Sequence, residues 1–171
     1  MGLQGVRRGA GPVALPVSIA LLLLAFVAGG CGGPDEKTQR VIDEIDDARL
    51  TLYEVSLRDA EPVSSKVQDD GSVSVRYDRD NGYYGFTLVI RKAVYDPHAC
   101  KARRDEGATC SWRDGILRST FEEMSEVALD RGGETLALSG LVTEKDPELL
   151  EDAVEALQKA KKVDAETVAS Y

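Results

Sequence analysis

From residue 63 to residue 90, apolar side chains alternate with polar ones, which is the period of a β-strand with one buried face. Asp70-Gly71 interrupts this alternation, and such a dipeptide is a strong signal for a two-residue β-hairpin turn. We therefore predict consecutive strands at 63–67, at 73–77 and from 84 to about 95, separated by short turns. Strands joined by such short connections must pair antiparallel, so the chain is expected to build an antiparallel sheet.

Apolar residues at spacings of three and four positions, as on one face of a helix, occur in three other segments. They predict helices at about 36–60, at 116–128 before Gly132-Gly133, and at 146–162. A further strand is expected at 136–142, and the last nine residues are expected to add a short strand or to fray. The order α-β-β-β-α-β-α predicts an α+β fold in which an antiparallel sheet of about four strands carries its helices on one face.

The first 30 residues differ from the rest of the chain in charge and hydropathy. Arg7 and Arg8 are their only charged side chains, and the following run 13–27 is almost wholly apolar. A helix of fifteen residues spans about 22 Å, which is less than the roughly 30 Å of a bilayer's hydrocarbon core. A basic start, a short apolar run and the small residues 28–30 together predict a secretory signal peptide.

Ala28-Gly29-Gly30-Cys31 is similar to the lipobox of bacterial lipoproteins, in which the cysteine is diacylated on sulfur and becomes the new N-terminus. The lipobox usually has leucine three residues before the cysteine, and Ala28 departs from that pattern. The resemblance implies a signal peptide at 1–30 and a spacer at 31–37. It also implies that lipid is attached at Cys31, with palmitate as a typical acyl chain. Residues 38–171 would then form a single domain.

This resemblance also implies a location at the outer face of the cytoplasmic membrane. Two acyl chains on one cysteine give stable membrane attachment, whereas a single chain gives only marginal binding. An ordinary secreted protein and an uncleaved signal anchor are the alternatives to a lipoprotein.

Cys100 and Cys110 remain after Cys31 is assigned to the lipid. In an exported domain the compartment is oxidising, so an even pair of cysteines predicts a disulfide. His98 lies two residues before Cys100 and raises metal binding as a competing idea. The three residues lack a fourth ligand and the close cysteine spacing of zinc sites, so we predict neither a metal site nor a cofactor.

Residues 96–113 are predicted to form a loop closed by this disulfide. Basic and aromatic side chains concentrate in the loop: His98, Lys101, Arg103, Arg104 and Trp112. Because arginine and tryptophan are frequent in interaction hot spots, the loop is a candidate contact surface. The alternative is a structural loop whose tryptophan packs into the core.

The charge of the exported part excludes some classes of partner. Residues 31–171 retain 19 basic and 30 acidic side chains, a formal net charge of −11. Such a domain repels phosphate backbones, so we predict no nucleic-acid binding. The sequence has no G-x-S-x-G elbow, Gly-rich phosphate loop, HExxH or paired CxxC motif, so we predict that the protein is not an enzyme. An acidic pair of the glycosidase type is not excluded by sequence.

The segment 134–142, which contains Leu138-Ser139-Gly140-Leu141-Val142, together with the helix expected at 146–162, resembles the second half of a BON domain. That family is associated with phospholipid surfaces, and its closing Gly-Val is replaced here by Lys162-Val163.

The sequence is consistent with two functions. The preferred one is a non-catalytic, lipid-anchored domain that binds a protein or an envelope component outside the membrane. The alternative is a carrier of lipids or small ligands that uses a groove between sheet and helices.

Overall fold

The computed structural model describes residues 33–79, 85–93, 97–144 and 146–171, and residues 34–171 form one compact unit. Its helices are α2 (Glu36–Ala48), α3 (Pro97–Asp105), α4 (Leu149–Gln158) and α5 (Ala165–Ala169). Its strands are β1 (Leu52–Glu54), β2 (Glu61–Val67), β3 (Val73–Asp78), β4 (Phe86–Arg91), β5 (Thr109–Arg113), β6 (Ile116–Phe121), β7 (Met124–Asp130), β8 (Thr135–Val142) and β9 (Lys161–Val163).

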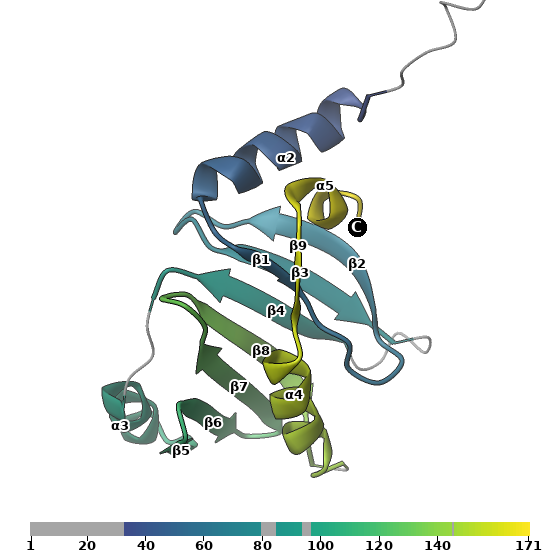
Figure 1. The fold of residues 1–171 in the computed structure, drawn as a ribbon. Helices are drawn as coiled ribbons and strands as arrows, with labels where there is room; N and C mark the ends of the chain where they lie inside the picture. Colours follow the sequence, from purple (N-terminus) through teal and green to yellow (C-terminus); the bar gives the residue numbers. More distant parts are fainter. Residues whose placement is uncertain (1–32, 80–84, 94–96, 145) are drawn as a thin grey trace, which may run out of the picture. The chain divides into compact units, whose positions relative to one another are not determined.

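Seven of these strands form one antiparallel sheet in the order β2-β3-β4-β8-β7-β6-β5 (Figure 1). The order consists of two runs of consecutive strands, β2 to β4 and β5 to β8, which meet where β4 pairs with β8. Strands β1 and β9 form a separate two-stranded antiparallel sheet. The predicted α+β class and antiparallel pairing are confirmed, and the sheet is larger than the four strands expected.

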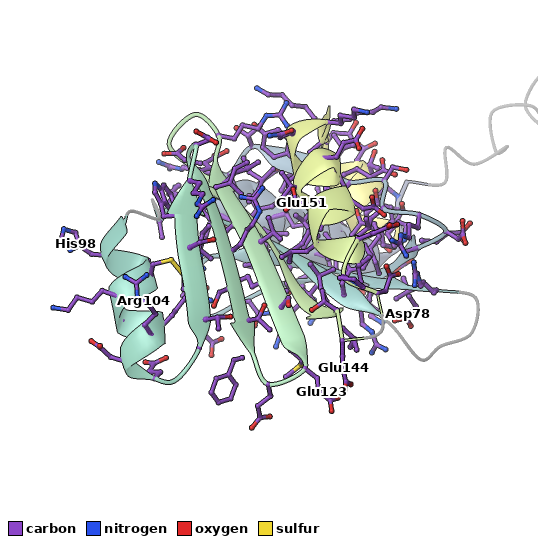
Figure 2. The ribbon with its side chains drawn as sticks, turned by 90° about the horizontal axis from the view of Figure 1, so that it is seen from below. Asp78, His98, Arg104, Glu123, Glu144 and Glu151 are labelled. Atoms are coloured by element: carbon purple, nitrogen blue, oxygen red, sulfur yellow. A yellow bond between two sulfur atoms is a disulfide. The ribbon has the colours of Figure 1, made fainter. Side chains whose placement is uncertain are left out.

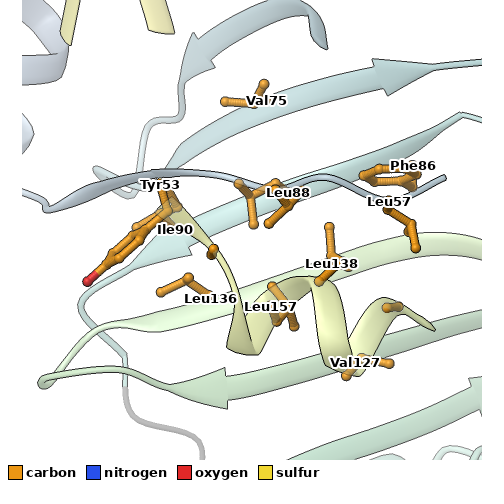
Figure 3. Close-up of a cluster of buried hydrophobic side chains, with 14 of the residues drawn as sticks. Tyr53, Leu57, Val75, Phe86, Leu88, Ile90, Val127, Leu136, Leu138 and Leu157 are labelled. Atoms are coloured by element: carbon orange, nitrogen blue, oxygen red, sulfur yellow. The ribbon is translucent and has the colours of Figure 1, made fainter. Parts of the chain in front are cut away.

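One face of the large sheet carries the main hydrophobic core, and α4 packs on that face against β7 and β8. Figure 3 shows Leu157 of α4 beside Leu138 of β8. In the same view Tyr53 and Leu57 lie over strand β4, whose Ile90 is 0% exposed. The alternating residues Val73, Val75, Tyr77, Phe86, Leu88 and Ile90 therefore point into one continuous core.

The opposite face of the sheet, which we call the outer face, is partly covered by α3. A second cluster of buried residues lies there, made by Cys100 of α3 with Leu117, Ala128 and Ala137 of the strands. Helices therefore lie on both faces, and the prediction of helices on one face is wrong. The connection from β4 to β5 reaches the far edge of the sheet and includes α3, which the sequence analysis had assigned to a loop.

The first predicted helix ends at Ala48 instead of continuing to residue 60. Arg49 adopts a left-handed conformation with φ of 52° and ends the helix as its C-cap. Leu52 then pairs with Val163 across the small sheet, a partner more than one hundred residues away. The helical spacing of Leu52 with the preceding apolar residues was therefore coincidental, because long-range strand pairing decides the structure of this segment.

The helix predicted at 116–128 is wrong, because this segment forms the β6-β7 hairpin. Val127, Ala128 and Leu129 are all buried, since α4 covers one face of β7 and the α3 cluster covers the other. A strand buried on both faces loses its alternation, which removes the usual sequence signal. The hairpin turn also lacks glycine, and Glu122 itself takes the positive φ of 54°.

The other predicted elements are confirmed with shifted ends. Strands β2, β3, β4 and β8 and helix α4 lie where the patterns placed them. Strand β4 ends at Arg91 instead of near residue 95, and residues 84 and 94–96 fall outside the described residues. Asp146 is not the N-cap of α4, because Glu148 occupies that position and the Asp146 carboxylate pairs with Arg58. The last nine residues contain the end of β9 and the short helix α5.

Tyr77 connects the two sheets through a buried hydrogen bond, in which the backbone N–H of Val55 donates to the Tyr77 hydroxyl at 3.2 Å. Burial raises the pKa of Tyr77 to about 12. Because the folded state holds this proton more tightly than the unfolded chain, the stabilisation is complete below pH 10 and is lost as the pH rises towards 12.

Replacing Tyr77 with phenylalanine is expected to lower the free energy of unfolding by about 1–3 kcal/mol at pH 8, because the buried Val55 N–H loses its acceptor. The difference from the wild type should narrow at pH 11.5, where the wild-type tyrosine begins to ionise. Urea unfolding of both proteins at the two pH values measures this change. A difference in the free energy of unfolding that stays constant with pH would contradict the raised pKa of Tyr77.

Candidate functional site

Within the described residues, the outer face is uncovered over β2, β3 and β4, and the α3 cluster begins at Ala137 of the next strand, β8. Strand register places Lys66, Ser74, Val89 and Ala137 side by side across these strands. The neighbouring row contains Ser64, Arg76, Thr87 and Ser139 in the same strand order. Most side chains of this part of the sheet are therefore polar or cationic, whereas the covered half beneath α3 is apolar.

Two adjoining hollows lie on this surface, with volumes of about 430 and 240 Å³. They share Val89 and Ser139, so they form one shallow depression, which we call the outer groove. Its lining residues are Ser64, Ser65, Lys66, Gln68, Ser74, Arg76, Thr87, Val89, Arg91, Arg103, Glu126, Ala137 and Ser139.

The outer groove has a local excess of positive charge, whereas the domain as a whole is acidic. Its described lining residues carry four cationic side chains, Lys66, Arg76, Arg91 and Arg103, against the single carboxylate of Glu126. Residues 31–171, by contrast, have a formal net charge of −11. A local excess of positive charge in an acidic protein attracts anions to this place and repels them elsewhere.

Two hydrogen bonds hold the Ser74 hydroxyl group in the groove. The Gln68 amide donates to Ser74 Oγ at 2.8 Å, and Ser74 Oγ donates to the carbonyl oxygen of Lys66 at 3.2 Å. Each hydroxyl oxygen can still accept a further hydrogen bond, since it has two lone pairs. The Arg76 side chain is 61% exposed, and its Nε and Nη2 groups donate to the Asp78 carboxylate at 3.0 and 3.3 Å, which offsets part of its charge.

Arg103 of α3 bounds one end of the groove. Its guanidinium donates two hydrogen bonds to the Glu126 carboxylate of β7, at 2.7 and 3.0 Å. Their side chains are only 25% and 19% exposed, and such partly buried bidentate pairs hold a fixed geometry. The ion pair therefore fixes the position of α3 relative to the sheet and the shape of the groove at that end.

No family model, curated protein or solved structure matches this chain. The functional interpretation therefore depends on the residues themselves, and the BON resemblance stays a prediction.

Some of the five predicted contact residues are exposed at the surface, and others make contacts that hold the fold together. His98 and Lys101 lie on the exposed side of α3, and Figure 2 shows His98 pointing away from the strands. Arg104 donates to the carbonyl oxygen of Cys110 at 3.0 Å, on the edge strand β5. Trp112 packs against the α3 cluster, as the structural alternative expected. Of the five residues, Arg103 is the one that reaches the groove.

The predicted disulfide between Cys100 and Cys110 is confirmed and joins α3 to β5, with 5.3 Å between the Cα atoms. Cys31 and the predicted signal peptide lie outside the described residues. Within the described part of the chain, no cluster of His, Cys, Asp and Glu could hold a metal ion. No helix in that part is long and apolar enough to cross a membrane.

Lys66, Arg76 and Arg91 were not predicted, because only the apolar half of the alternation indicated the strands. A signal was present in the other half, where Ser64, Lys66, Ser74, Arg76 and Thr87 occupy the outward positions of successive strands. Reading both faces of each strand would have placed these side chains on one surface.

A different hollow, of about 460 Å³, lies between residues 54–58 and α4. Arg58 pairs there with Asp152, and also with Asp146 just before the helix. Its hydrogen bond holds the pKa of the Asp146 carboxyl below the usual range and raises that of the Arg58 guanidinium. Because these charges are paired with one another, we assign Arg58 a structural role.

Proposed function

We propose that this protein is a lipid-anchored, non-catalytic binding protein that presents its domain outside the cytoplasmic membrane. The observation that carries the proposal is the outer groove, a polar surface with a local positive charge in an otherwise acidic domain. A protein or another component of the cell envelope is the expected partner. The anchor is supported by the lipobox resemblance at Cys31 and by the disulfide, because disulfides persist in exported proteins.

The carrier alternative receives less support from the packing of the domain. Apolar side chains fill the space between the large sheet and α4. The hollow beside α4 is lined by charged groups such as Arg58, Asp152 and Lys159. A more apolar hollow near Phe86 and Leu149 holds about 270 Å³, just below the range of roughly 300–1,000 Å³ that is common for ligand sites.

Replacing Cys31 with alanine is expected to abolish the incorporation of radiolabelled palmitate and to move the protein out of the detergent phase in a phase-partition assay. The physical reason is that the proposed acyl chains have no other attachment point and supply the membrane affinity. Expression of both proteins in a bacterium with lipoprotein processing enzymes permits the comparison.

Cys110→Ala is the matched control, since it also removes one sulfur but leaves the lipobox unchanged. It should incorporate palmitate at the wild-type level. Equal labelling of the wild type and Cys31→Ala would refute the lipid anchor.

A further inference from the structure

We propose that the outer groove binds a segment of an anionic polysaccharide. This inference rests on the proposed function, because the anchor would place the domain among the polymers of the cell envelope. It specifies the chemistry of the partner, which the proposed function leaves open.

The placement of the cations indicates a ligand with several negative charges. Lys66, Arg76 and Arg91 lie on three adjacent strands, and Arg103 lies beyond them on α3. Neighbouring strands are about 4.8 Å apart, so the positive charges extend over roughly 15 Å of the surface. A small anion could contact only one of these cations, whereas a polymer with a charge on successive units could contact Lys66, Arg76 and Arg91 together, while Arg103 stays paired with Glu126.

The remaining lining residues favour a sugar polymer. The hydroxyl groups of Ser64, Ser74, Thr87 and Ser139 line the same depression as the cations. Hydroxyl groups both donate and accept hydrogen bonds, which matches the hydroxyl groups of a saccharide. Asp78 occupies one edge of the exposed Arg76 guanidinium, and the remaining edge, formed by Nη1 and Nη2, can donate two parallel hydrogen bonds to a carboxylate or sulfate group.

An acidic peptide is the less suitable partner for this surface. Extended peptides usually bind by adding a strand to the unpaired edge of a sheet. The outer groove lies instead on a sheet face, where backbone groups of β3, β4 and β8 pair with neighbouring strands on both sides. The nearest edge, β2, contains Pro62 and a bulge, which disfavour the addition of another strand.

Binding of polygalacturonate to the full-length protein in neutral detergent micelles tests the proposal. We expect saturable binding that weakens with added salt, binding to dextran sulfate as well, and none to uncharged dextran. Lys66→Gln/Arg76→Gln should weaken binding by about tenfold, because each exposed charge pair contributes up to about a factor of five. Lys66→Arg/Arg76→Lys keeps both charges but loses the guanidinium fork of Arg76, so it should weaken binding less than Lys66→Gln/Arg76→Gln does.

Lys161→Gln/Lys162→Gln is the matched control, since it removes two exposed charges on β9, away from the groove. This control should leave the affinity within about twofold. Absence of polygalacturonate binding, an equal loss in the control, or tighter binding of poly-L-glutamate would each overturn the proposal. Unchanged thermal unfolding of the variants would show that the loss is not caused by misfolding.

Failure of this inference and failure of the proposed anchor give different results. Palmitate labelling of Cys31 without polygalacturonate binding would refute the ligand and leave the anchor intact. Binding without labelling would support the groove and refute the anchor.

Discussion

Leu138→Ala is expected to lower the free energy of unfolding by about 3–5 kcal/mol, the largest loss that we predict for a single substitution. Leu138 is 0% exposed and lies in the central strand β8, between Leu88 of β4 and Val127 of β7. It also lies beside Leu157 of α4 (Figure 3). Truncation would therefore leave a cavity where both runs of strands meet the helix.

Chemical unfolding of the wild type and Leu138→Ala measures this loss. Val63→Ala is the matched control, since it also shortens an aliphatic side chain in the sheet. Val63 is 45% exposed on the edge strand β2, so the control should change stability by less than about 0.5 kcal/mol. A loss below 1 kcal/mol for Leu138→Ala would show that β8 is not at the centre of the core.

Strand β8 also explains why part of this fold could be predicted from the sequence. Its signal, like those of β3 and β4, came from local alternation, and Asp70-Gly71 supplied the turn between β2 and β3. The pairing of Leu52 with Val163 left no local signal, because it depends on residues at opposite ends of the domain. The β6-β7 hairpin was missed because α3 and α4 bury both faces of β7.

The candidate site was only partly predictable for a related reason. The disulfide and the candidate residue Arg103 could be predicted from the local composition of the chain. In the structure, both hold α3 in position. The groove combines side chains from four strands and one helix, so its charge emerges only when the strand order is known. Lys66 and Arg91 are 25 residues apart in sequence, and nothing local relates them.

The two faces of β8 connect stability to the proposed function. Leu138 points into the core, while its neighbour Ser139 lines the outer groove. Since the core fixes the strands, the hydroxyl groups and cations of the groove lie on a rigid surface. The cationic end formed by Arg103 is different, because it belongs to α3 and depends on how firmly that helix is held to the sheet.

Removing the disulfide is therefore expected to affect both stability and binding. Cys100→Ala/Cys110→Ala should lower the free energy of unfolding by about 3 kcal/mol, the value that chain entropy predicts for a closed loop of this length. The Arg103–Glu126 ion pair and the small cluster around Cys100 would remain to hold α3. Because these contacts are few, amide hydrogen exchange in α3 should accelerate more than exchange in β3 and β4.

Reduction of the wild type with a thiol reagent is the control for this variant. It should reproduce the stability loss, whereas the same reagent should leave the double variant unchanged. Polygalacturonate affinity should fall less than in Lys66→Gln/Arg76→Gln, because only the end of the groove formed by Arg103 becomes less ordered. If the exchange of α3 stayed at the wild-type rate, the ion pair with Glu126 would be sufficient to position the helix, and the disulfide would stabilise the protein only through its unfolded state.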